Sequence, residues 1–592
     1  MSQSPEPPGG GCKFAMPEAI LYSRFRLSPP GERPAARPAK TAERADASQT
    51  YDDPALAVLA RGVDNAFYLN MYKDVADANI DPVLHYHKHG WRERRDPNIW
   101  FDTHWYLENY HDVRRAEIDP FLHYLQYGRK EQRPFRSPYK YRRAVVYAAI
   151  PPSKRVVKSV VPPDAKVLTE EEINGCLIEA CSGRRGFVLS VSHDCYVNFR
   201  GGIQLVIAEE QRLFAADRVT YLHVSPTAGL LTFGRGQVEP TILQVALDGQ
   251  YLGTTAAVAL QLAIARLQHL LVSPRTFVLH SALGHRPAEL VELARALKAD
   301  HHIFWVHDYA ASCEGFNLLR DDLEFCGAPA AESAACRICV YGESRSEHLA
   351  LVRELFAALP FHVLAPSSAA LAVWQAANRL PHLSSRVVPH CRFEPWSEEC
   401  ELREPRSAGD LVRVAFVGYP TAQKGWPLFL ELFRRLIGFE GYHFYQFAAP
   451  AMLRPMQDLT CIPVETTSAN RFSMVTALAE QLIDLVLLLS PWPETFSFVT
   501  YEAFAAGADV IALAAAGNAA DAVRHQQRGV VIADDSALFD FFLDGGALEY
   551  CRLRDAAGRR PGRLLMTGTT AMFDPTSAGG TEIKRFPCAT GK

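Results

Sequence analysis

Two glutamates eight positions apart are the first residues in this chain whose types and spacing suggest chemistry. Both lie in the segment "PETFSFVTYEAFAAG", where Glu494 precedes a predicted helix and Glu502 falls inside it. A carboxylate is costly to bury unless hydrogen-bond donors surround it, so one explanation is a ligand rich in hydroxyl groups. The other explanation is that Glu494 caps the helix and Glu502 lies on its solvated face. Spacing alone leaves both open.

Buried strands hold this segment on both sides. The run "DLVLLLS" at 484–490 comes before it, and "DVIALA" at 509–514 comes after it. Both carboxylates are therefore expected at the carboxyl end of a parallel strand, where ligands of doubly wound sheets bind. The helix that starts near Ser497 offers free N–H groups and a positive dipole end to a diphosphate. Glu502 can accept two hydrogen bonds from a vicinal diol such as a ribose.

The same alternation of short strands and amphipathic helices extends over most of the chain. It begins at Gly186, breaks in the charged segment at 392–410, and then resumes. Buried strands alternating with helices predict an α/β fold with two Rossmann-like, doubly wound parallel-sheet domains that face each other across a ligand cleft. We place these domains at residues 186–395 and 410–535, followed by a C-terminal helix and tail at 536–592.

The N-terminal part is organised differently. Residues 1–50 contain eight prolines and no sustained period, so we expect them to be disordered. A tandem repeat with a period of 38 residues follows at 51–137 and predicts a small all-α module of stacked helical pairs, joined to the rest by a linker at 138–185. Its aromatic and histidine side chains either form a core or bind sugar. The matching positions are Tyr68 and Tyr106, Asp74 and Asp112, Asp81 and Asp119, His85 and His123, and Gly90 and Gly128.

Composition argues against several classes of protein. The 592 residues carry a net charge of −4, which does not fit a protein that coats nucleic acid. The sequence has no apolar run long enough to span a membrane and no apolar core of a signal peptide near its N-terminus, so a cytoplasmic protein is expected. The basic, proline-punctuated stretch at 134–165 is either a solvated connector or a peripheral contact with the inner face of a membrane.

Four of the thirteen cysteines cluster within 27 residues. A Cys-x-x-Cys pair is the tight pair of a zinc knuckle, and two further thiolates complete a tetrahedral site. We therefore predict one structural zinc, with buried thiols that pack as small hydrophobic groups as the alternative. The cysteines are Cys313, Cys326, Cys336 and Cys339.

The segment around the two glutamates resembles the Glu-x7-Glu motif of the retaining family-4 glycosyltransferases, which have the two-domain GT-B fold. The resemblance extends over about residues 186–540. "FVGYPTAQKGWPLFLELF" is similar to the first strand, loop and helix of that family's nucleotide-sugar domain. "RGGIQLVIAEE" is similar to the glycine-rich loop of its acceptor domain, and "FWVHDY" to the strand end that carries a histidine. The tandem repeat resembles modules appended to bacterial glycosyltransferases that build surface polysaccharides.

The resemblance implies roles for individual residues. His307 would hydrogen-bond the donor sugar, Glu494 would bind its hydroxyl groups, and Lys424 with the helix start would stabilise charge on the leaving diphosphate. No catalytic metal is expected, because protein cations take this role and no Asp-x-Asp stands near these motifs. The implied donor-binding residues are Glu502, Lys424, Gly201, Gly202, Gly418, Thr495, Phe496 and Ser497.

One position departs from the family. Many members have an arginine directly after the glycine of the "VAFVG" strand, where this chain has Tyr419. Phosphate binding would then rest on Lys424 and helix N–H groups, or on an arginine elsewhere such as Arg471.

These features predict a retaining glycosyltransferase of the hexosyltransferase type. It would transfer a sugar from a nucleotide-diphosphate donor to a glycan or lipid-linked acceptor in bacterial surface polysaccharide assembly. Two alternatives stay open. A non-catalytic GT-B glycan-binding or assembly subunit is allowed by Tyr419 and the added repeat. Another GT-B enzyme, such as an epimerase or a phosphorylase, is the second alternative, although the chain has no lysine context suited to the pyridoxal phosphate of a phosphorylase.

Overall fold

The computed structural model describes residues 51–573, with gaps at 99, 132, 199–200, 235–240, 397–409, 437–440 and 467–469, and with only 142, 145–146 and 149–150 described between 136 and 161. The tail at 1–50, for which disorder is expected, lies outside the described residues. Contacts between Cα atoms divide the chain into two compact units. One holds the tandem repeat and residues 430–436, and the other holds both predicted sheets.

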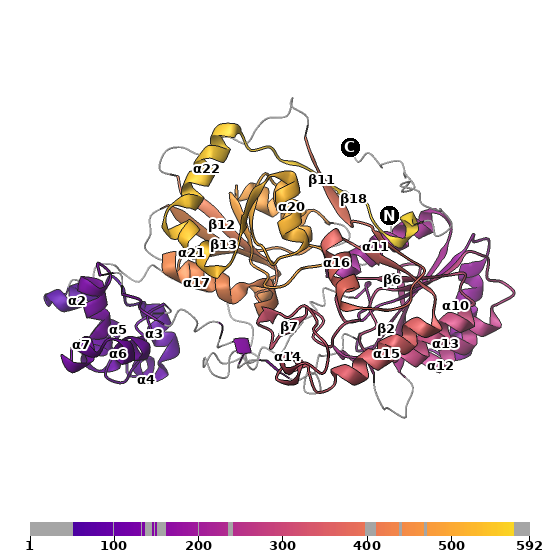
Figure 1. The fold of residues 1–592 in the computed structure, drawn as a ribbon, viewed down its shortest axis with the longest axis horizontal. Helices are drawn as coiled ribbons and strands as arrows, with labels where there is room; N and C mark the ends of the chain where they lie inside the picture. The colour runs from indigo at the N-terminus through magenta and orange to yellow at the C-terminus, as the bar shows by residue number, and fades with distance from the viewer. Residues whose placement is uncertain are drawn as a thin grey trace, which may run out of the picture. The chain divides into compact units, whose positions relative to one another are not determined.

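The first sheet has the strand order β10-β9-β6-β5-β1-β2-β3-β4 (Figure 1). The strands from β10 to β2 are parallel, whereas β3 and β4 form an antiparallel hairpin at one edge. Asp248 and Gly249 connect this hairpin with positive φ at both positions, as a tight two-residue turn requires. The strands are β1 (Phe187–Val191), β2 (Thr220–Pro226), β3 (Ile242–Leu247), β4 (Gln250–Ala256), β5 (Arg275–Leu279), β6 (His301–Trp305), β9 (Phe361–Ala365) and β10 (Ser384–Val387).

Helices cover both faces of this sheet. Thr169 and Glu172 form a capping box that starts α10, and Pro287 occupies the first turn of α13, where no N–H is needed. Neighbouring helices α10, α12, α13 and α15 pack in a row, and they are seen together in Figure 1. The helices are α10 (Glu170–Cys181), α11 (Gly202–Ala216), α12 (Ala257–Arg266), α13 (Pro287–Leu297), α14 (Ala334–Arg337), α15 (Arg345–Ala358) and α16 (Ser368–Ala377), with a small hairpin of β7 (Leu319–Arg320) and β8 (Glu324–Phe325) before α14.

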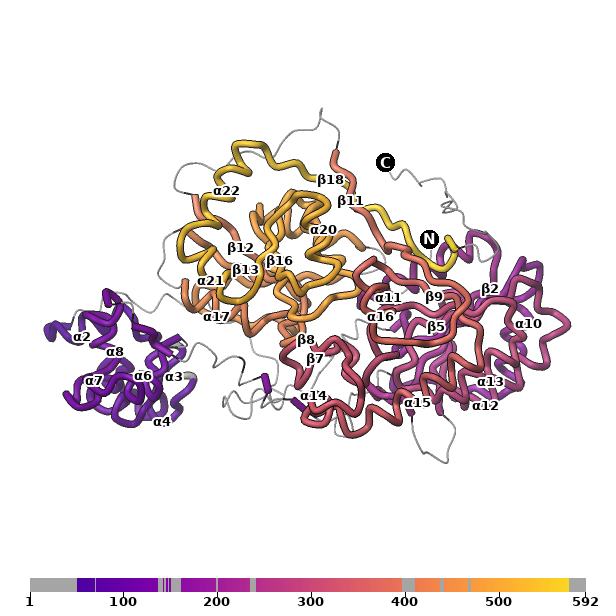
Figure 2. The backbone as a smooth tube through the Cα atoms, viewed as in Figure 1, coloured from indigo at the N-terminus to yellow at the C-terminus, as the bar shows by residue number. Residues whose placement is uncertain are grey.

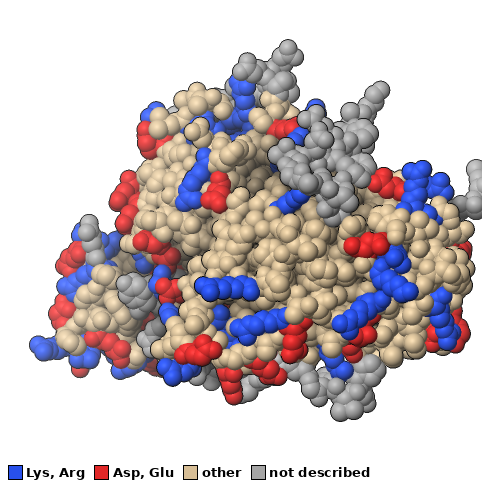
Figure 3. Space-filling view, turned by 45° about the vertical axis from the view of Figure 1, so that its right-hand side comes forward, with Lys and Arg blue, Asp and Glu red and all other residues tan. Residues whose placement is uncertain are grey.

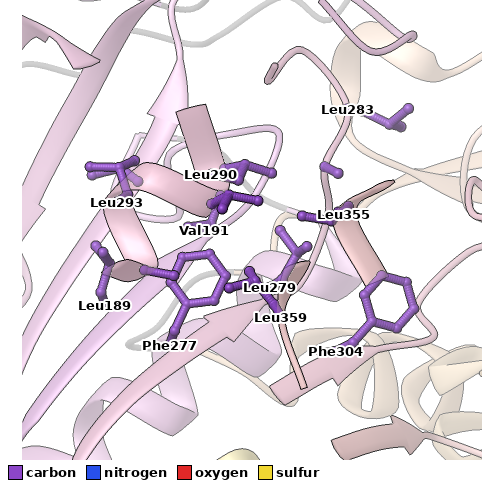
Figure 4. Close-up of a cluster of buried hydrophobic side chains, with 14 of the residues drawn as sticks. Leu189, Val191, Phe277, Leu279, Leu283, Leu290, Leu293, Phe304, Leu355 and Leu359 are labelled. Atoms are coloured by element: carbon purple, nitrogen blue, oxygen red, sulfur yellow. The ribbon is translucent and has the colours of Figure 1, made fainter. Parts of the chain in front are cut away.

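The core of this part follows from the alternation of side chains along each strand. Leu189 and Val191 of β1 point to one face, where they meet Phe277 of β5 and Leu290 of α13 (Figure 4). Val188, between them in sequence, joins a second cluster on the other face with residues of α11. The strands are therefore apolar on both faces, which is why the sequence has continuous apolar runs here and no alternation of apolar with polar residues.

The second sheet has six parallel strands in the order β14-β13-β12-β15-β16-β17. Phe416 of β12 contacts Phe429 of α17, which packs this helix on the sheet. The elements are β12 (Val412–Val417), η4 (Ala422–Lys424), α17 (Trp426–Leu436), β13 (Tyr442–Ala448), η5 (Pro450–Met452), β14 (Leu459–Pro463), α18 (Ser473–Glu480), β15 (Leu485–Leu488), α19 (Phe498–Ala505), β16 (Asp509–Leu513), α20 (Asn518–Gln526), β17 (Gly529–Ile532), α21 (Asp535–Leu543) and α22 (Gly546–Ala557).

After α22 the chain returns toward the first sheet. Strand β18 (Gly562–Met566) pairs antiparallel with β11 (Cys391–Pro395), and Figure 2 shows the two running side by side. The turn η6 (Thr570–Met572) then contacts α11 and donates the Thr570 N–H to Glu210 at 2.8 Å. Residues far apart in the sequence thus share one hydrogen-bond network.

The tandem-repeat unit has the same element order in both copies. An aspartate precedes each Pro-led helix and accepts its first N–H groups. In each copy a buried tyrosine hydroxyl lies 3.0 Å from a histidine Nδ1, in the pairs Tyr68–His85 and Tyr106–His123. The elements are α2 (Pro54–Leu59), then α3 (Asn65–Met71), α4 (Lys73–Asp77), α5 (Pro82–His85) and η1 (Tyr86–Gly90), and then α6 (Thr103–Asn109), α7 (His111–Arg115), α8 (Pro120–His123) and η2 (Tyr124–Gly128).

The predicted α/β fold class is confirmed, because the chain has two Rossmann-like, doubly wound domains, each built on a largely parallel sheet. One difference concerns the stretch 138–185, where a linker is expected. It contains α10, whose Ile173 and Leu177 join the core of the first sheet. On the face drawn in Figure 3, acidic and basic side chains are interspersed.

Candidate functional site

The strand order of the second sheet reverses between β12 and β15. From β12 the chain moves outward through β13 to β14, and then starts again at β15 on the other side of β12. Ligands of open α/β sheets bind at the carboxyl ends of the strands, at this point of reversal. Gly418 and Lys424 follow β12, and Glu494 follows β15, so the fold places the predicted donor-binding residues there.

Glu494 lies in this loop with only 4% of its surface exposed. Its carboxylate accepts a hydrogen bond from Lys424 Nζ at 2.9 Å and another from the Ser490 hydroxyl. The lysine side chain is still partly exposed. The segments after β12 and β15 therefore bring a cation and an anion together, and the partly exposed cation can reach a ligand phosphate.

Glu502 is in a different electrostatic state. It is 9% exposed on α19, and within the described part of the chain no hydrogen bond or ion pair reaches its carboxylate. Burial raises the pKa of Glu502 from its ordinary value of 4.5 to about 7. A buried carboxyl without protein donors is costly, so this side chain is suited to a ligand that brings hydroxyl donors.

Three hydrogen bonds join the loop after β15 to the first domain. Thr495 Oγ1 donates to the backbone carbonyl of His307 at 2.7 Å, and Tyr309 Oη donates to the carbonyl of Pro493 at 2.7 Å. Ser367 Oγ donates to the carbonyl of Thr495, also at 2.7 Å. The predicted His307 and Glu494 are thus brought to one region, because the loop that carries Glu494 packs on the strand end that carries His307.

The predicted glycines lie where backbone approaches the site. Gly202 begins α11 without a side-chain cap, and a Cβ there would lie 3.7 Å from Phe498 Cδ2 at the start of α19. Gly201 directly precedes it in an extended conformation. Gly418 has φ of 105°, a value that favours glycine, and a Cβ there would meet nothing within 4 Å.

Two of the predicted donor-binding residues already have protein partners. The Ser497 N–H, expected to be free for a diphosphate, donates to Asn518 Oδ1 at 3.1 Å, and the Thr495 hydroxyl is used as described above. Phe496 packs its ring against His390 and Tyr501. In this structure these three residues position the loop, and Lys424 and the N–H groups of α11 are left to face an anion.

The carboxyl edge of the first sheet carries several buried histidines that the sequence motifs do not single out. His280 follows β5 as His307 follows β6, and the rings stack with centroids 5.3 Å apart. His280 Nδ1 lies 3.0 Å from His307 Nε2. Burial first, and then the neighbouring His390 and His280, lower the pKa of His307 well below its usual range, so its ring is neutral.

His390 was also missed. Its Nδ1–H donates to the Gly568 carbonyl at 3.0 Å, and its Nε2 is buried without a hydrogen-bond partner among the described residues. Burial lowers the pKa of His390 to about 4. Its position after β10 in sequence could have drawn attention to it, but the partner at Gly568 lies 178 positions away and no local pattern indicates it.

The departure at Tyr419 leaves a half-exposed tyrosine after β12, with 40% of its surface accessible. Arg471, the substitute considered from the sequence, donates from Nη1 to Glu209 Oε2 of α11 at 3.1 Å. It therefore lies at the boundary of the two sheets but already has an acidic partner.

The arrangement of the described side chains does not support the predicted zinc site. Among the described residues, no group of three or more His, Cys, Asp or Glu side chains has an arrangement that could hold a metal ion. The cysteines line a small apolar cavity of about 20 Å³ that they share with Arg345, and Arg345 Nη1 lies 2.7 Å from Cys336 Sγ. A guanidinium beside one sulfur disfavours a dication. Burial raises the pKa of Cys313 to about 12 and also raises the pKa values of Cys326 and Cys339.

Over the described ranges, no helix has the length and apolar character that crossing a membrane would need.

No protein-family model and no curated protein sequence matches the chain. Solved structures do resemble it. HepE from Anabaena in complex with UDP-glucose is 11% identical over 63% of this chain and 92% of its own, with a TM-score of 0.35. TarM is 9% identical over 63% and 94%, with a TM-score of 0.37. WaaG, described as a glycosyltransferase involved in lipopolysaccharide biosynthesis, is 13% identical over 62% and 93%, with a TM-score of 0.34. Likenesses this weak carry no argument about chemistry, so the function is argued from the site.

Proposed function

We propose that this protein is a retaining glycosyltransferase that moves a sugar from a nucleotide-diphosphate donor to a glycan or lipid-linked acceptor. The observation that carries the proposal is that one strand reversal holds both Lys424, a partly exposed cation, and Glu502, a buried carboxylate that no hydrogen bond from a described residue reaches. A nucleoside diphosphate supplies both complements, since its phosphates suit the lysine and its ribose diol suits the carboxylate.

The donor would span the loop after β15. Glu502 on α19 would accept hydrogen bonds from the two ribose hydroxyls, and the diphosphate would lie between Lys424 and the N–H groups that begin α11 at Gly202. The sugar would then extend toward Glu494 and His307, which the bond from Thr495 to the His307 carbonyl holds close together. This order follows the sequence of groups along a nucleotide sugar.

In the transfer step, the bond between the sugar and the diphosphate breaks and the acceptor oxygen bonds to the same sugar carbon on the same face. The hydrogen bond from Lys424 to Glu494 would weaken, and Lys424 would stabilise the negative charge that develops on the leaving diphosphate. The leaving phosphate oxygen would accept the acceptor proton, so no protein nucleophile is needed. Glu494 would hold sugar hydroxyls through the step, and the packed loop would exclude water.

Calorimetry with a panel of nucleoside diphosphates tests this assignment. Hydrogen bonds to a charged group contribute about 1.5–3 kcal/mol, so Glu502→Ala should weaken binding by roughly 10- to 150-fold. Glu494→Ala should lower the rate of sugar transfer or donor hydrolysis more than it weakens binding of the bare nucleotide. Glu549→Ala, which removes an exposed glutamate of α22, is the matched control and should change neither.

Wild-type-like binding and transfer by both Glu502→Ala and Glu494→Ala would reject the site. Nucleotide binding without any transfer or hydrolysis would instead favour the second candidate, a non-catalytic GT-B subunit that binds glycan. Tyr419 in place of a phosphate-binding arginine and the engaged Arg471 are the observations that favour this candidate.

The wider role remains part of the proposal. The tandem repeat at 51–137 favours assembly of a bacterial surface polysaccharide, and the basic stretch at 134–165, most of which lies outside the described residues, would contact an anionic membrane surface from the cytoplasm. No catalytic metal is proposed. Flotation of the protein with anionic vesicles, compared with neutral vesicles, tests the membrane contact.

A further inference from the structure

A line of three buried side chains ends at His307. Glu210 of α11 has no exposed surface, and its Oε1 lies 3.2 Å from His280 Nε2. His280 Nδ1 in turn lies 3.0 Å from His307 Nε2. The Trp305 ring stacks on His307 at 5.2 Å and an interplanar angle of 8°, which fixes the orientation of the last ring.

The donors around Glu210 determine which atoms carry protons. Its Oε1 accepts a hydrogen bond from Tyr221 Oη at 2.9 Å, and its Oε2 accepts one from the Thr570 N–H at 2.8 Å. The pKa of Glu210 is lowered, because hydrogen bonds and His280 outweigh its burial, so the carboxyl is ionised and can only accept. His280 must therefore carry a proton on Nε2.

The protonated nitrogen of His280 determines which nitrogen of His307 carries a proton. In its neutral form, a His280 ring with its proton on Nε2 has a lone pair on Nδ1 and accepts there, whereas a doubly protonated ring would donate from Nδ1. We take His280 as neutral. The neighbouring nitrogen 3.0 Å away, His307 Nε2, must then be the donor. A neutral His307 that donates from Nε2 has its remaining lone pair on Nδ1, and no other hydrogen bond reaches that ring among the described residues.

We propose that Glu210 and His280 are positioning residues that hold His307 in the tautomer with its proton on Nε2, so that Nδ1 accepts a hydrogen bond from the ligand. The hydrogen-bond chain itself does not depend on what the ligand is. The role of Nδ1 as acceptor from a sugar or acceptor hydroxyl rests on the proposed function. In that role His307 orients a hydroxyl group and does not protonate a leaving group.

The tautomer is measurable in the full-length protein without substrate. Nitrogen-15 chemical shifts of the histidine rings, assigned to His307 by its absence in His307→Gln, distinguish a protonated ring nitrogen from one with a lone pair. The expected result is a protonated Nε2 and an unprotonated Nδ1. A protonated Nδ1 on His307 would overturn the proposal, because it would mean that His280 is the donor to His307.

Glu210→Gln makes a second, sharper test. The Thr570 backbone N–H requires an oxygen at the Oε2 position, so the amide nitrogen of glutamine is directed to the side of His280 and Tyr221, whose hydroxyl can turn to accept. The amide would then donate to His280 Nε2, His280 would donate from Nδ1, and His307 would move its proton to Nδ1. Inverted ring shifts at His307 are the expected outcome, and unchanged shifts would contradict the proposal.

Tyr221→Phe is the matched control. It removes one hydrogen bond from the same Glu210 oxygen but leaves the His280 bond in place, so the His307 tautomer should not change. In a transfer assay, Glu210→Gln should lower kcat by roughly tenfold or more, because the wrong tautomer presents a donor where an acceptor is needed. Its affinity for a nucleoside diphosphate should stay within about twofold of wild type. Inverted ring shifts with a normal kcat would support the hydrogen-bond chain but exclude a role for the His307 tautomer in transfer. If the wild-type protein transfers no sugar at all, the proposed function is wrong, and the tautomer result still stands.

Discussion

The tandem-repeat unit and the loop region around Glu494 and Glu502 use similar side chains in opposite ways. In the repeats, the buried tyrosine and histidine of each copy bond each other: Tyr68 bonds His85, and Tyr106 bonds His123 at the same 3.0 Å. After the strand reversal of the second sheet, no hydrogen bond from a described residue reaches the buried Glu502 carboxylate. At the edge of the first sheet, His390 Nε2 is buried without a described partner. Buried groups that lack protein partners are costly, so they indicate where a ligand is expected.

This difference changes how the aromatic and histidine residues of the repeats are interpreted. Their matching positions could indicate sugar binding, but the contacts account for them as structure. Gly90 and Gly128 each face the hydroxyl of the buried tyrosine, at distances of 2.1 and 2.4 Å from an added Cβ. The repeated residues therefore form the core of their own unit.

The largest effect is expected at Lys424. Lys424→Ala should lower the rate of sugar transfer by roughly 100- to 1,000-fold, since one preorganised group that stabilises transition-state charge typically contributes that much. Steady-state kinetics with the donor identified by the nucleotide panel gives the measurement. Arg95→Ala, which removes an equally basic residue from the repeats, should leave kcat within about twofold. Equal losses in both variants would erase the distinction between the two regions.

Ionisation of Glu502 should lower the free energy of unfolding as pH rises. Its folded pKa of about 7 lies above the ordinary 4.5, so between these values the folded state holds a proton that the unfolded state has lost. Stability is therefore expected to fall from pH 4.5 to 7, by an amount on the order of 3 kcal/mol from this group. Glu502→Gln should be more stable than wild type above pH 7 and similar below pH 4.5.

Denaturant unfolding of both proteins across this pH range provides the check. Saturating nucleoside diphosphate should shrink the difference, because ribose hydroxyls would then satisfy the carboxylate. A Gln variant that tracks wild type at every pH would mean that Glu502 is solvated, and the contrast with the repeats would lose its main support.

A smaller, purely structural effect is expected in the repeats. Gly128→Ala places a Cβ 2.4 Å from Tyr106 Oη but 3.6 Å from Tyr106 Cζ, so the hydroxyl is the obstacle. The substitution should destabilise the repeat unit by about 1–3 kcal/mol, the usual cost of overpacking. Adding Tyr106→Phe should recover part of that loss, as measured by thermal unfolding. The rate of sugar transfer, measured at a temperature where the variant is folded, should be unaffected. A lower rate would mean that the repeat unit contributes to transfer.

The smallest effect is expected at Asp74. Its side chain is well exposed and pairs with Arg95 at 2.7 Å, and exposed ion pairs contribute about 0.2–1 kcal/mol. Asp74→Ala should lower stability by no more than this, and high salt should remove the difference. A loss above 2 kcal/mol, measured by denaturant unfolding, would show that this pair is part of the packed core and not a surface contact.

Sequence patterns were informative wherever a physical rule acts locally. Continuous apolar runs predicted strands that are buried on both faces, and the break at 392–410 separated the two sheets. The family resemblance assigned Lys424 and Glu494 to one donor site, and they lie 2.9 Å apart because the carboxyl ends of neighbouring parallel strands meet at one edge. The capping box at Thr169 could have located α10 within the expected linker, since that signal too is local.

The cysteine cluster shows what local reasoning leaves out. The spacing of Cys336 and Cys339 fits a zinc knuckle, but the fate of the thiols depends on Arg345, which comes from the start of another helix and lies against Cys336. Ligand spacing describes what a loop could hold. Whether the loop holds a metal ion depends also on the charged side chain that packs beside its cysteines.

The sequence by itself determined the two sheets, the motif between β15 and β16, and the repeats, because each rests on periodicity or on neighbours a few positions apart. Only the tertiary structure decided that Glu502 lacks a partner, that Ser497 is already bonded to Asn518, and that Glu210, His280 and His307 form one line. Burial and hydrogen-bond pairing join residues tens or hundreds of positions apart, as Thr570 and Glu210 are, and a linear pattern does not carry that information.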